Sequence, residues 1–158
     1  MNTHRGLLHH QSIVVSNVKV SSQFYRPMFE YFDYELTASD LEGDYPYQDY
    51  KRWDLNTPHE FSICQSRNEQ SSVEYVRWAV GHHHHIAFCA DDREDVDRFY
   101  STVLVPLNEK GLCNIMDRPC DCPEYNEYYY ATFFFDPDGL KYEFVIAENF
   151  LRMKEARS

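Results

Sequence analysis

Two histidines and one glutamate could together bind a metal ion, although they lie far apart in the sequence. His10 and His85 each stand beside a run of apolar residues typical of a β-strand, and Glu143 lies inside a third such run. Two imidazoles and one carboxylate that leave coordination positions open suit a divalent ion such as Fe²⁺, Mn²⁺, Zn²⁺, Co²⁺ or Ni²⁺. Such an ion acts as a Lewis acid on a substrate that binds it through its own oxygens. This chemistry requires a fold that brings the three side chains together.

The two histidines belong to a pattern that occurs twice in the chain. When His10 is aligned with His85, the Phe-Tyr pair that begins at Phe24 aligns with the pair that begins at Phe99. Self-similarity at a constant offset indicates a repeated structural unit. Two copies are too few for a solenoid, so we expect one fold built from two related modules.

Each copy of the pattern predicts one strand, one helix and about three further strands. We expect a first βαβββ module over residues 7–65 and a second over residues 82–147, within a single domain of residues 1–158. A helix covers only one face of such a sheet, and a second module can complete the fold. The sequence therefore predicts an α+β fold in which two tandem modules form a cup-shaped mixed sheet with the helices outside.

The alternation of side chains along a strand selects the residues that face the inside of this cup. If Ile13 and Phe88 pack against the helices, His10 and His85 point to the opposite face of the sheet. Glu143 points the same way, because its two apolar neighbours in the last strand face the helix side. The same argument applied to three strands thus places the three candidate ligands on one concave surface.

Simpler interpretations of these residues remain open. If the inward and outward faces of the strands were shifted by one residue, His9 and His84 would face the cup in place of His10 and His85. The repeat aligns both pairs equally well, and only the expected packing of the apolar residues favours His10 and His85. The histidine run 82–85 could also bind metal adventitiously at the surface. Glu143 could be a solvent-facing strand residue.

Periodicity and turn residues predict the remaining elements. One helix is expected to begin at Ser21 or Ser22, with Pro27 tolerated only in its first two turns, and the other at Asp91 or Asp92, with Gly111 beyond its end. Seven further strands are predicted over 7–15, 34–36, 51–55, 61–65, 111–115, 128–135 and 140–146, and another begins on the histidine run 82–85 and continues through residue 88. Between and after them we expect a tight turn over 136–139, loops over 40–50 and 116–126, a linker over 66–80 with a short helix near 73–78, and a short helix over 147–158.

Composition limits the partners of the protein. The 26 acidic and 15 basic residues give a net charge of -11, which disfavours binding to nucleic acid and to anionic membranes. No apolar run reaches membrane-spanning length and the N-terminus lacks an apolar signal core, so we expect a cytoplasmic protein. The five cysteines are expected to be free thiols, although Cys113, Cys120 and Cys122 could form a thiolate metal site of unusual spacing.

The chain resembles the glyoxalase/bleomycin-resistance/extradiol-dioxygenase superfamily, also called the vicinal oxygen chelate superfamily. In many members a His of the first strand, a His of the fifth and a Glu of the eighth bind the metal, and these positions match His10, His85 and Glu143. The resemblance implies a metal-dependent lyase, isomerase or dioxygenase that acts on a small substrate with adjacent oxygens, and a homodimer. It rests on the segments 10–17, 85–88 and 133–143, and on the Phe-Tyr pairs 24–25 and 99–100.

Departures from the family patterns limit the choice of reaction. Ser62 stands where glyoxalase I-like members usually have a further Glu ligand, which weakens that assignment. Phe133 stands where extradiol dioxygenases commonly have a Tyr, which weakens a ring-cleaving function. The two-His, one-Glu set is also similar to that of the thiol-transferring fosfomycin-resistance enzymes, whose phosphonate and potassium sites cannot be located in this sequence.

Two alternatives to a metalloenzyme remain. One is a metal-free binding protein of the bleomycin-resistance type, which holds flat or cationic ligands between aromatic walls and suits an acidic, Tyr-rich chain. The other is a small interaction module. For the enzyme and the binding protein alike, the candidate pocket residues are Ser12, Trp53, Ser62, Tyr129, Tyr130 and Phe133. Tyr129 and Tyr130 are adjacent in a predicted strand, so only one of them can face inward.

Overall fold

The chain divides into two compact units, each with its own β-sheet. The computed structural model describes residues 8–53, 59–67 and 75–146. The units comprise Met1–Val73 and Glu74–Ser158. The predicted α+β fold with two tandem modules is confirmed, and each module has an open four-stranded sheet. None of the described helices is long and apolar enough to cross a membrane.

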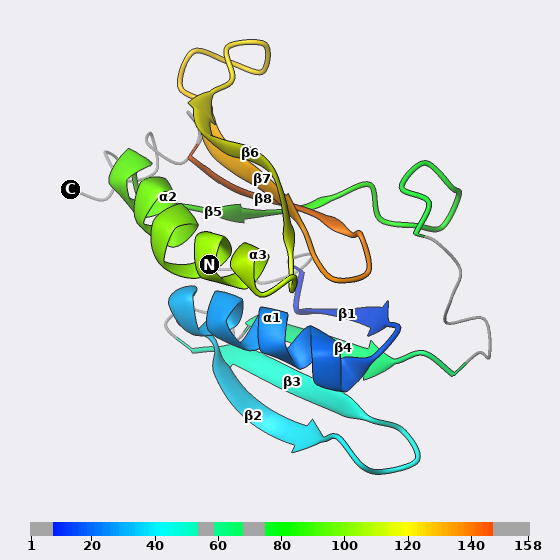
Figure 1. Ribbon diagram of the computed structural model, residues 1–158. Coiled ribbons are helices and arrows are strands. Elements are labelled where there is room, and N and C mark those ends of the chain that lie inside the picture. Colours follow the sequence, from blue (N-terminus) through cyan, green and yellow to red (C-terminus); the bar gives the residue numbers. More distant parts are fainter. Residues whose placement is uncertain (1–7, 54–58, 68–74, 147–158) are drawn as a thin grey trace, which may run out of the picture. The chain divides into compact units, whose positions relative to one another are not determined.

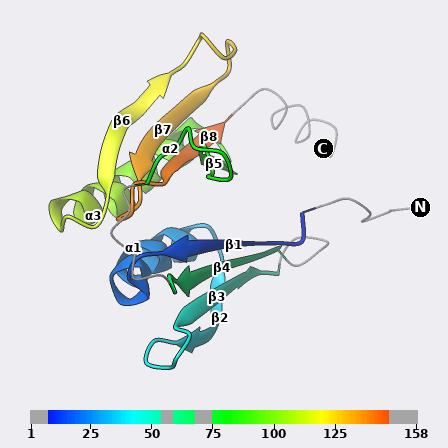
Figure 2. The ribbon, with the colours of Figure 1, turned by 90° about the vertical axis from the view of Figure 1, so that its right-hand side faces the viewer.

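The first unit is a mixed sheet with helix α1 on one face, as Figures 1 and 2 show. The strand order is β1-β4-β3-β2, with β1 parallel to β4 and the other neighbours antiparallel. The elements are β1 (His10–Val15), α1 (Val18–Tyr31), β2 (Glu35–Asp40), β3 (Tyr47–Arg52) and β4 (His59–Gln65).

Aromatic packing between α1 and the sheet forms the core of this unit. The ring of Phe29 lies 4.8 Å from that of Phe61 on β4, and Ile13 and Val15 of β1 are buried on the same side. Val14, between them, is 70% exposed. The predicted phase of β1 is therefore correct: Ile13 and Val15 face the helix, and the alternate residues face away.

Helix α1 begins earlier than predicted and continues through its proline. The Asn17 side chain accepts hydrogen bonds from the backbone N–H groups of Lys19 and Val20, so Asn17 is the N-cap and the prediction of Ser21 or Ser22 is wrong. Pro27 lies in the helix interior, beyond its first two turns. Buried residues on both sides of it pack against the sheet, and this packing outweighs the lost backbone hydrogen bond.

The second unit repeats this plan with a longer helical segment. The strand order is β5-β8-β7-β6, with β5 parallel to β8 (Figure 1). The elements are β5 (Ile86–Cys89), α2 (Arg93–Phe99), a π-helical turn (Tyr100–Leu104), α3 (Val105–Glu109), β6 (Asn114–Asp121), β7 (Tyr130–Phe135) and β8 (Lys141–Ile146).

The helical segment of this unit changes its hydrogen bonding just before Pro106. The Asp92 side chain caps α2 by accepting from the N–H of Asp95, as predicted. The N–H of Val105 bonds to the carbonyl of Tyr100, which widens one turn into a π-helix. Pro106 has no N–H to donate, so the regular α-helical hydrogen bonds are interrupted there, which accounts for the π-helical turn. Gly111 follows the last turn at a φ of 70°.

Two predicted loops contain strands. Residues 47–50 belong to β3, although their polar and aromatic composition predicts a loop. Residues 116–121 belong to β6, whose pairing with β7 shifts at two points. Because β6 is an edge strand, Pro119 interrupts no central ladder there.

Smaller differences affect element ends. The predicted strand 34–36 extends over Glu35–Asp40, and residues 75–78 form no helix. The predicted end of the strand 51–55, the loop 56–58, part of the linker 66–80 and the C-terminal helix 147–158 lie outside the described residues.

The turn over residues 136–139 joins β7 and β8 and sets their register. The Asp136 carboxylate accepts hydrogen bonds from the N–H groups of Asp138 and Leu140, and Gly139 has a φ of 91°. This register pairs Phe133 with Glu143 across the two strands. The turn predicted from the sequence thus positions the candidate carboxylate ligand.

Candidate metal site

Glu143 lies in the middle of β8 and faces away from the helical segment of the second unit. Its neighbours Tyr142 and Phe144 pack towards that segment, where Phe144 lies 4.8 Å from the ring of Phe99. Glu143 itself is only 3% exposed. A carboxylate this deeply buried needs hydrogen bonds or a countercharge.

Three side chains approach the buried carboxylate. The Tyr129 hydroxyl donates to Oε2 over 2.7 Å, and the Lys141 ammonium donates to Oε1 over 2.8 Å. The His85 Nε2 atom lies 3.6 Å from Oε1. Glu143 therefore has one oxygen bound by a hydroxyl and the other shared between a cation and an imidazole.

His85 comes immediately before β5, and strand pairing brings it to Glu143. Ala87 pairs with Glu143 in the parallel ladder of β5 and β8. The Nδ1 atoms of His84 and His85 are 2.7 Å apart, so the Nε2 atom of His85 is the one directed at the carboxylate. His84 instead packs its ring against Trp78, and partial desolvation, aided by Arg77, lowers the pKa of His84.

The spacing of these two groups fits adjacent ligands of one metal ion. Two ligands at about 2.1 Å from a divalent ion lie about 3.0 to 3.4 Å apart at octahedral to tetrahedral angles. The separation of 3.6 Å between His85 Nε2 and Glu143 Oε1 is close to that range. Within the described part of either unit, no three His, Cys, Asp or Glu side chains form a potential metal-binding group. The second unit by itself thus offers two ligands.

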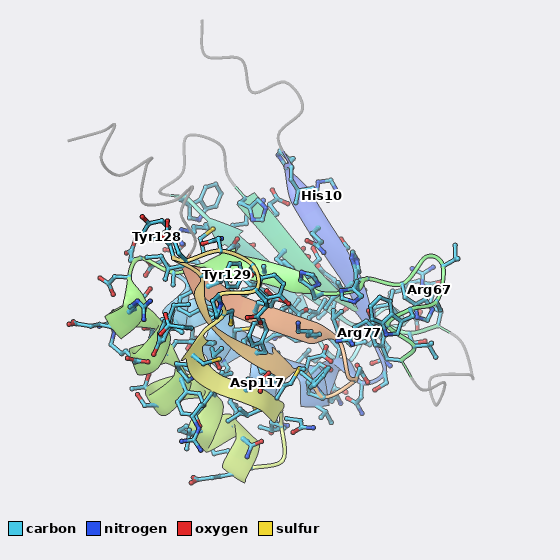
Figure 3. The ribbon with its side chains drawn as sticks, turned by 90° about the horizontal axis from the view of Figure 1, so that it is seen from above. His10, Arg67, Arg77, Asp117, Tyr128 and Tyr129 are labelled. Carbon is cyan, nitrogen blue, oxygen red and sulfur yellow. The ribbon has the colours of Figure 1, made fainter. Side chains whose placement is uncertain are left out.

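The third predicted ligand, His10, belongs to the first unit. It starts β1 (Figure 3), and its Nδ1 lies 3.2 Å from Nδ1 of the adjacent His9. Ser12 pairs with Ser62 in the parallel ladder of β1 and β4. His10, Ser12 and Ser62 therefore lie on the face of the sheet that α1 does not cover.

Polar contacts cover part of this open face. The Ser62 hydroxyl donates to Asp49 over 2.7 Å. Lys51 forms an ion pair of 2.8 Å with Glu60, which lowers the pKa of that carboxyl, and lies 5.6 Å from the ring of Trp53. Trp53 itself is 56% exposed.

Two adjacent tyrosines lie in different environments. Tyr129, which Figure 3 shows next to Tyr128, bonds Glu143, and burial with this hydrogen bond raises the pKa of Tyr129. Tyr130 donates to Asp97 of α2 over 2.7 Å, and burial is the main reason why the pKa of Tyr130 rises to about 12. Only Tyr129 therefore lies with the candidate ligand, and Tyr130 belongs to the helix side.

Sequence reasoning missed Lys141. This residue lies two positions before Glu143 on β8, so strand alternation puts both on the same face. Its Nζ also lies 4.4 Å from the centre of the Phe133 ring. The alternation argument that selected Glu143 could have found Lys141 as well.

The cysteines give no three-thiolate site among the described residues. Cys113 is buried and donates to the carbonyl of Leu104 over 3.6 Å. Cys120 and Cys122 lie with their sulfurs 3.9 Å apart at the end of β6. All five thiols are free, as predicted.

Known structures share this architecture. A candidate glyoxalase from Bacillus halodurans is 25% identical, with 89% of this chain and 96% of that chain covered at a TM-score of 0.68. A glyoxalase family protein from Enterococcus faecalis is also 25% identical, covering 91% of this chain and 100% of that chain at a TM-score of 0.55. The fosfomycin resistance protein FosX from Listeria monocytogenes, in complex with Mn(II) and 1S,2S-dihydroxypropylphosphonic acid, is 15% identical, covering 96% of this chain and 99% of that chain at a TM-score of 0.61. No protein-family model and no curated protein matches the chain.

Proposed function

We propose that this chain, which shares the fold of solved glyoxalase-family proteins, belongs to the glyoxalase/bleomycin resistance/dioxygenase superfamily and is a metal-dependent enzyme. Its substrate is a small molecule with two adjacent oxygens, and the reaction is of the lyase, isomerase or dioxygenase type. The observation that carries this proposal is the pair formed by His85 and Glu143, whose 3.6 Å spacing suits two ligands of one ion.

The proposed ligands are His85 and Glu143 from the second unit and His10 from the first. A bound divalent ion would act as a Lewis acid and polarise the substrate oxygens. The FosX relative, which binds Mn(II), supports a divalent ion in this fold. Tyr129 would fix the orientation of the ligand carboxylate through its hydrogen bond to Oε2, as outer partners of metal ligands commonly do.

Other residues would bind the substrate. Phe133, which is buried and pairs with Glu143 across β7 and β8, would form an apolar wall behind the carboxylate. Ser12, Ser62 and Trp53 would contribute hydroxyls and one exposed ring from the first unit. Tyr129 acts in this proposal as a hydrogen-bond donor, because its hydroxyl donates to Glu143 and its pKa is raised above the ordinary tyrosine value, which disfavours a role as a base near neutral pH.

A specific contact also favours a second function, that of a metal-free binding protein for small aromatic or cationic molecules. Lys141 already neutralises Glu143, so the buried carboxylate has a countercharge without any metal. In this function the exposed ring of Trp53 would bind the ligand.

Metal affinity and metal-dependent turnover distinguish the two functions. Mn²⁺, Ni²⁺, Zn²⁺ and anaerobic Fe²⁺ are titrated calorimetrically into wild type, His85→Ala and the matched control His84→Ala. Each loaded protein is then assayed with dicarbonyls plus thiols and with catechols plus oxygen. We expect wild type and His84→Ala to bind an ion and to lose turnover on chelation, and His85→Ala to bind weakly. The absence of ion binding, together with binding of aromatic cations, would instead support the metal-free function.

Assembly and location remain predictions of the same proposal. We expect a homodimer, as is common in the superfamily, and a cytoplasmic protein. Sedimentation equilibrium of the purified chain measures the first, and cell fractionation measures the second.

A further inference from the structure

We propose that Lys141 is an internal countercharge that competes with the metal ion for Glu143 and thereby sets metal affinity. This inference rests on the proposed metal site. It assigns a role to a residue that is not itself a ligand.

The contact between Lys141 and Glu143 is almost fully removed from water. Their side chains are 8% and 4% exposed, and Nζ lies 2.8 Å from Oε1. An unpaired charge in such a position is strongly destabilising, whereas a close ion pair compensates much of the desolvation. The ammonium therefore compensates the charge of the carboxylate and fixes its position through the contact to Oε1.

The position of the ammonium is fixed by more than the ion pair. Its Nζ lies 4.4 Å from the centre of the Phe133 ring, a favourable cation–π distance. The pairing of β7 with β8 holds Phe133 opposite Glu143. Lys141 thus has two partners that keep its charge at the carboxylate.

The ammonium and the candidate metal position use the same oxygen. His85 Nε2 approaches Oε1, the atom that Lys141 contacts, and Oε2 is bound by Tyr129. A divalent ion between His85 and Oε1 would lie next to a cation in a poorly hydrated environment, where like charges repel strongly. Metal binding must therefore displace the ammonium or bear this repulsion, and either one lowers the affinity.

The test compares Lys141→Met, which keeps an unbranched side chain one atom shorter and removes the charge, with Lys141→Arg, which keeps the charge. Calorimetric titration with Mn²⁺ and Zn²⁺ gives the affinity, and thermal unfolding without metal gives the stability. We expect Lys141→Met to unfold at a lower temperature without metal but, because the repulsion between the ammonium and the ion is removed, to bind the ions at least about tenfold more tightly. Lys141→Arg should remain near wild type. The double variant Lys141→Met/Glu143→Gln should lose the added affinity.

Each other outcome supports or overturns a defined part of the two proposals. Equal or weaker binding by Lys141→Met, with wild type still binding, overturns the role of Lys141 and leaves the proposed function intact. Binding by Lys141→Met alone supports the role of Lys141 and overturns the proposed function, because the wild-type protein would then bind no metal. No binding by any variant overturns both. If Lys141→Met does not fold, Lys141→Gln is measured in its place with the same expectations.

Discussion

The Tyr129 hydroxyl donates a 2.7 Å hydrogen bond to Oε2 of Glu143 and thereby joins the residue just before β7 to the middle of β8. The next residue, Tyr130, makes a bond of the same length to Asp97 on the opposite side of the sheet. Tyr129 therefore bonds to a buried carboxylate and Tyr130 to an exposed one. The two tyrosines permit a direct comparison of the same type of hydrogen bond in two environments.

Tyr129→Phe should destabilise the protein more than Tyr130→Phe does. Removal of the Tyr129 hydroxyl leaves a buried, ionised oxygen without its donor, which costs about 1 to 3 kcal/mol. Removal of the Tyr130 hydroxyl frees the exposed Asp97, which water can solvate, so the loss should stay below about 1 kcal/mol. Urea denaturation measures both free energies of unfolding. Equal losses would show that the environment of Glu143 is more hydrated than its burial indicates.

Stability should fall in mild acid partly because of His59. Burial, with a smaller contribution from His9, lowers the pKa of His59 from its ordinary value of 6.5. The folded protein therefore binds this proton less readily than the unfolded chain. The stability that neutral His59 contributes to the fold is fully present above about pH 6.5 and is lost as the pH falls through the lowered pKa of His59.

His59→Gln should consequently flatten the dependence of melting temperature on pH between pH 7.5 and 5.5. The measurement is a series of thermal melts, with His83→Gln as the control on the exposed histidine run. If His59→Gln and wild type lose stability in parallel over this interval, His59 does not contribute to the acid sensitivity.

Gly139→Ala should weaken both the fold and the proposed site. Gly139 has a φ of 91°, which a residue with a Cβ adopts only at a cost of about 1 to 2 kcal/mol. The nearest atom to an added Cβ is 3.7 Å away, so the cost arises from the backbone and not from a clash. Gly139→Asn should lose less stability, because Asn tolerates positive φ better. Chemical denaturation of both variants tests this, and equal losses would contradict the backbone explanation.

The thiols should differ sharply in alkylation. Burial raises the pKa of Cys113 to about 11 and, as the largest of several causes, that of Cys122 to about 12. At pH 8 about one in a thousand or fewer of these groups is a thiolate, the reactive form. Mass spectrometry after brief treatment with iodoacetamide should find Cys89, which is exposed, labelled before either of them. Equal labelling rates would contradict the burial of Cys113 and Cys122.

Much of the fold could be predicted because its signals are local and strong. The repeat predicted both modules, and the turn residues over 136–139 predicted the hairpin of β7 and β8. Strand β3 was predicted to start at residue 51 instead of Tyr47, because residues 47–50 are polar and their pairing depends on β2 and β4 rather than on their own composition. Strand β6 was predicted to end at residue 115 instead of Asp121, because Pro119 ordinarily argues against a strand, but an edge position tolerates it.

The site could be predicted in part. Alternation correctly placed Tyr142 and Phe144 on the helix side of β8, and therefore Glu143 on the other side. It could not show that Lys141 and Tyr129 bind the two carboxylate oxygens, because these contacts depend on side-chain conformations and on the register between strands. The participation of His10 with His85 and Glu143 stays a prediction.

The metal content of His10→Ala tests that prediction most directly, because His10 is the proposed ligand from the first unit. Wild type, His10→Ala and the matched control His9→Ala are loaded with Mn²⁺ or Zn²⁺, dialysed and analysed for bound metal. The proposed site predicts about one ion per chain in wild type and His9→Ala, and a large loss in His10→Ala. Equal metal content in His10→Ala and wild type would contradict a site shared by His10, His85 and Glu143.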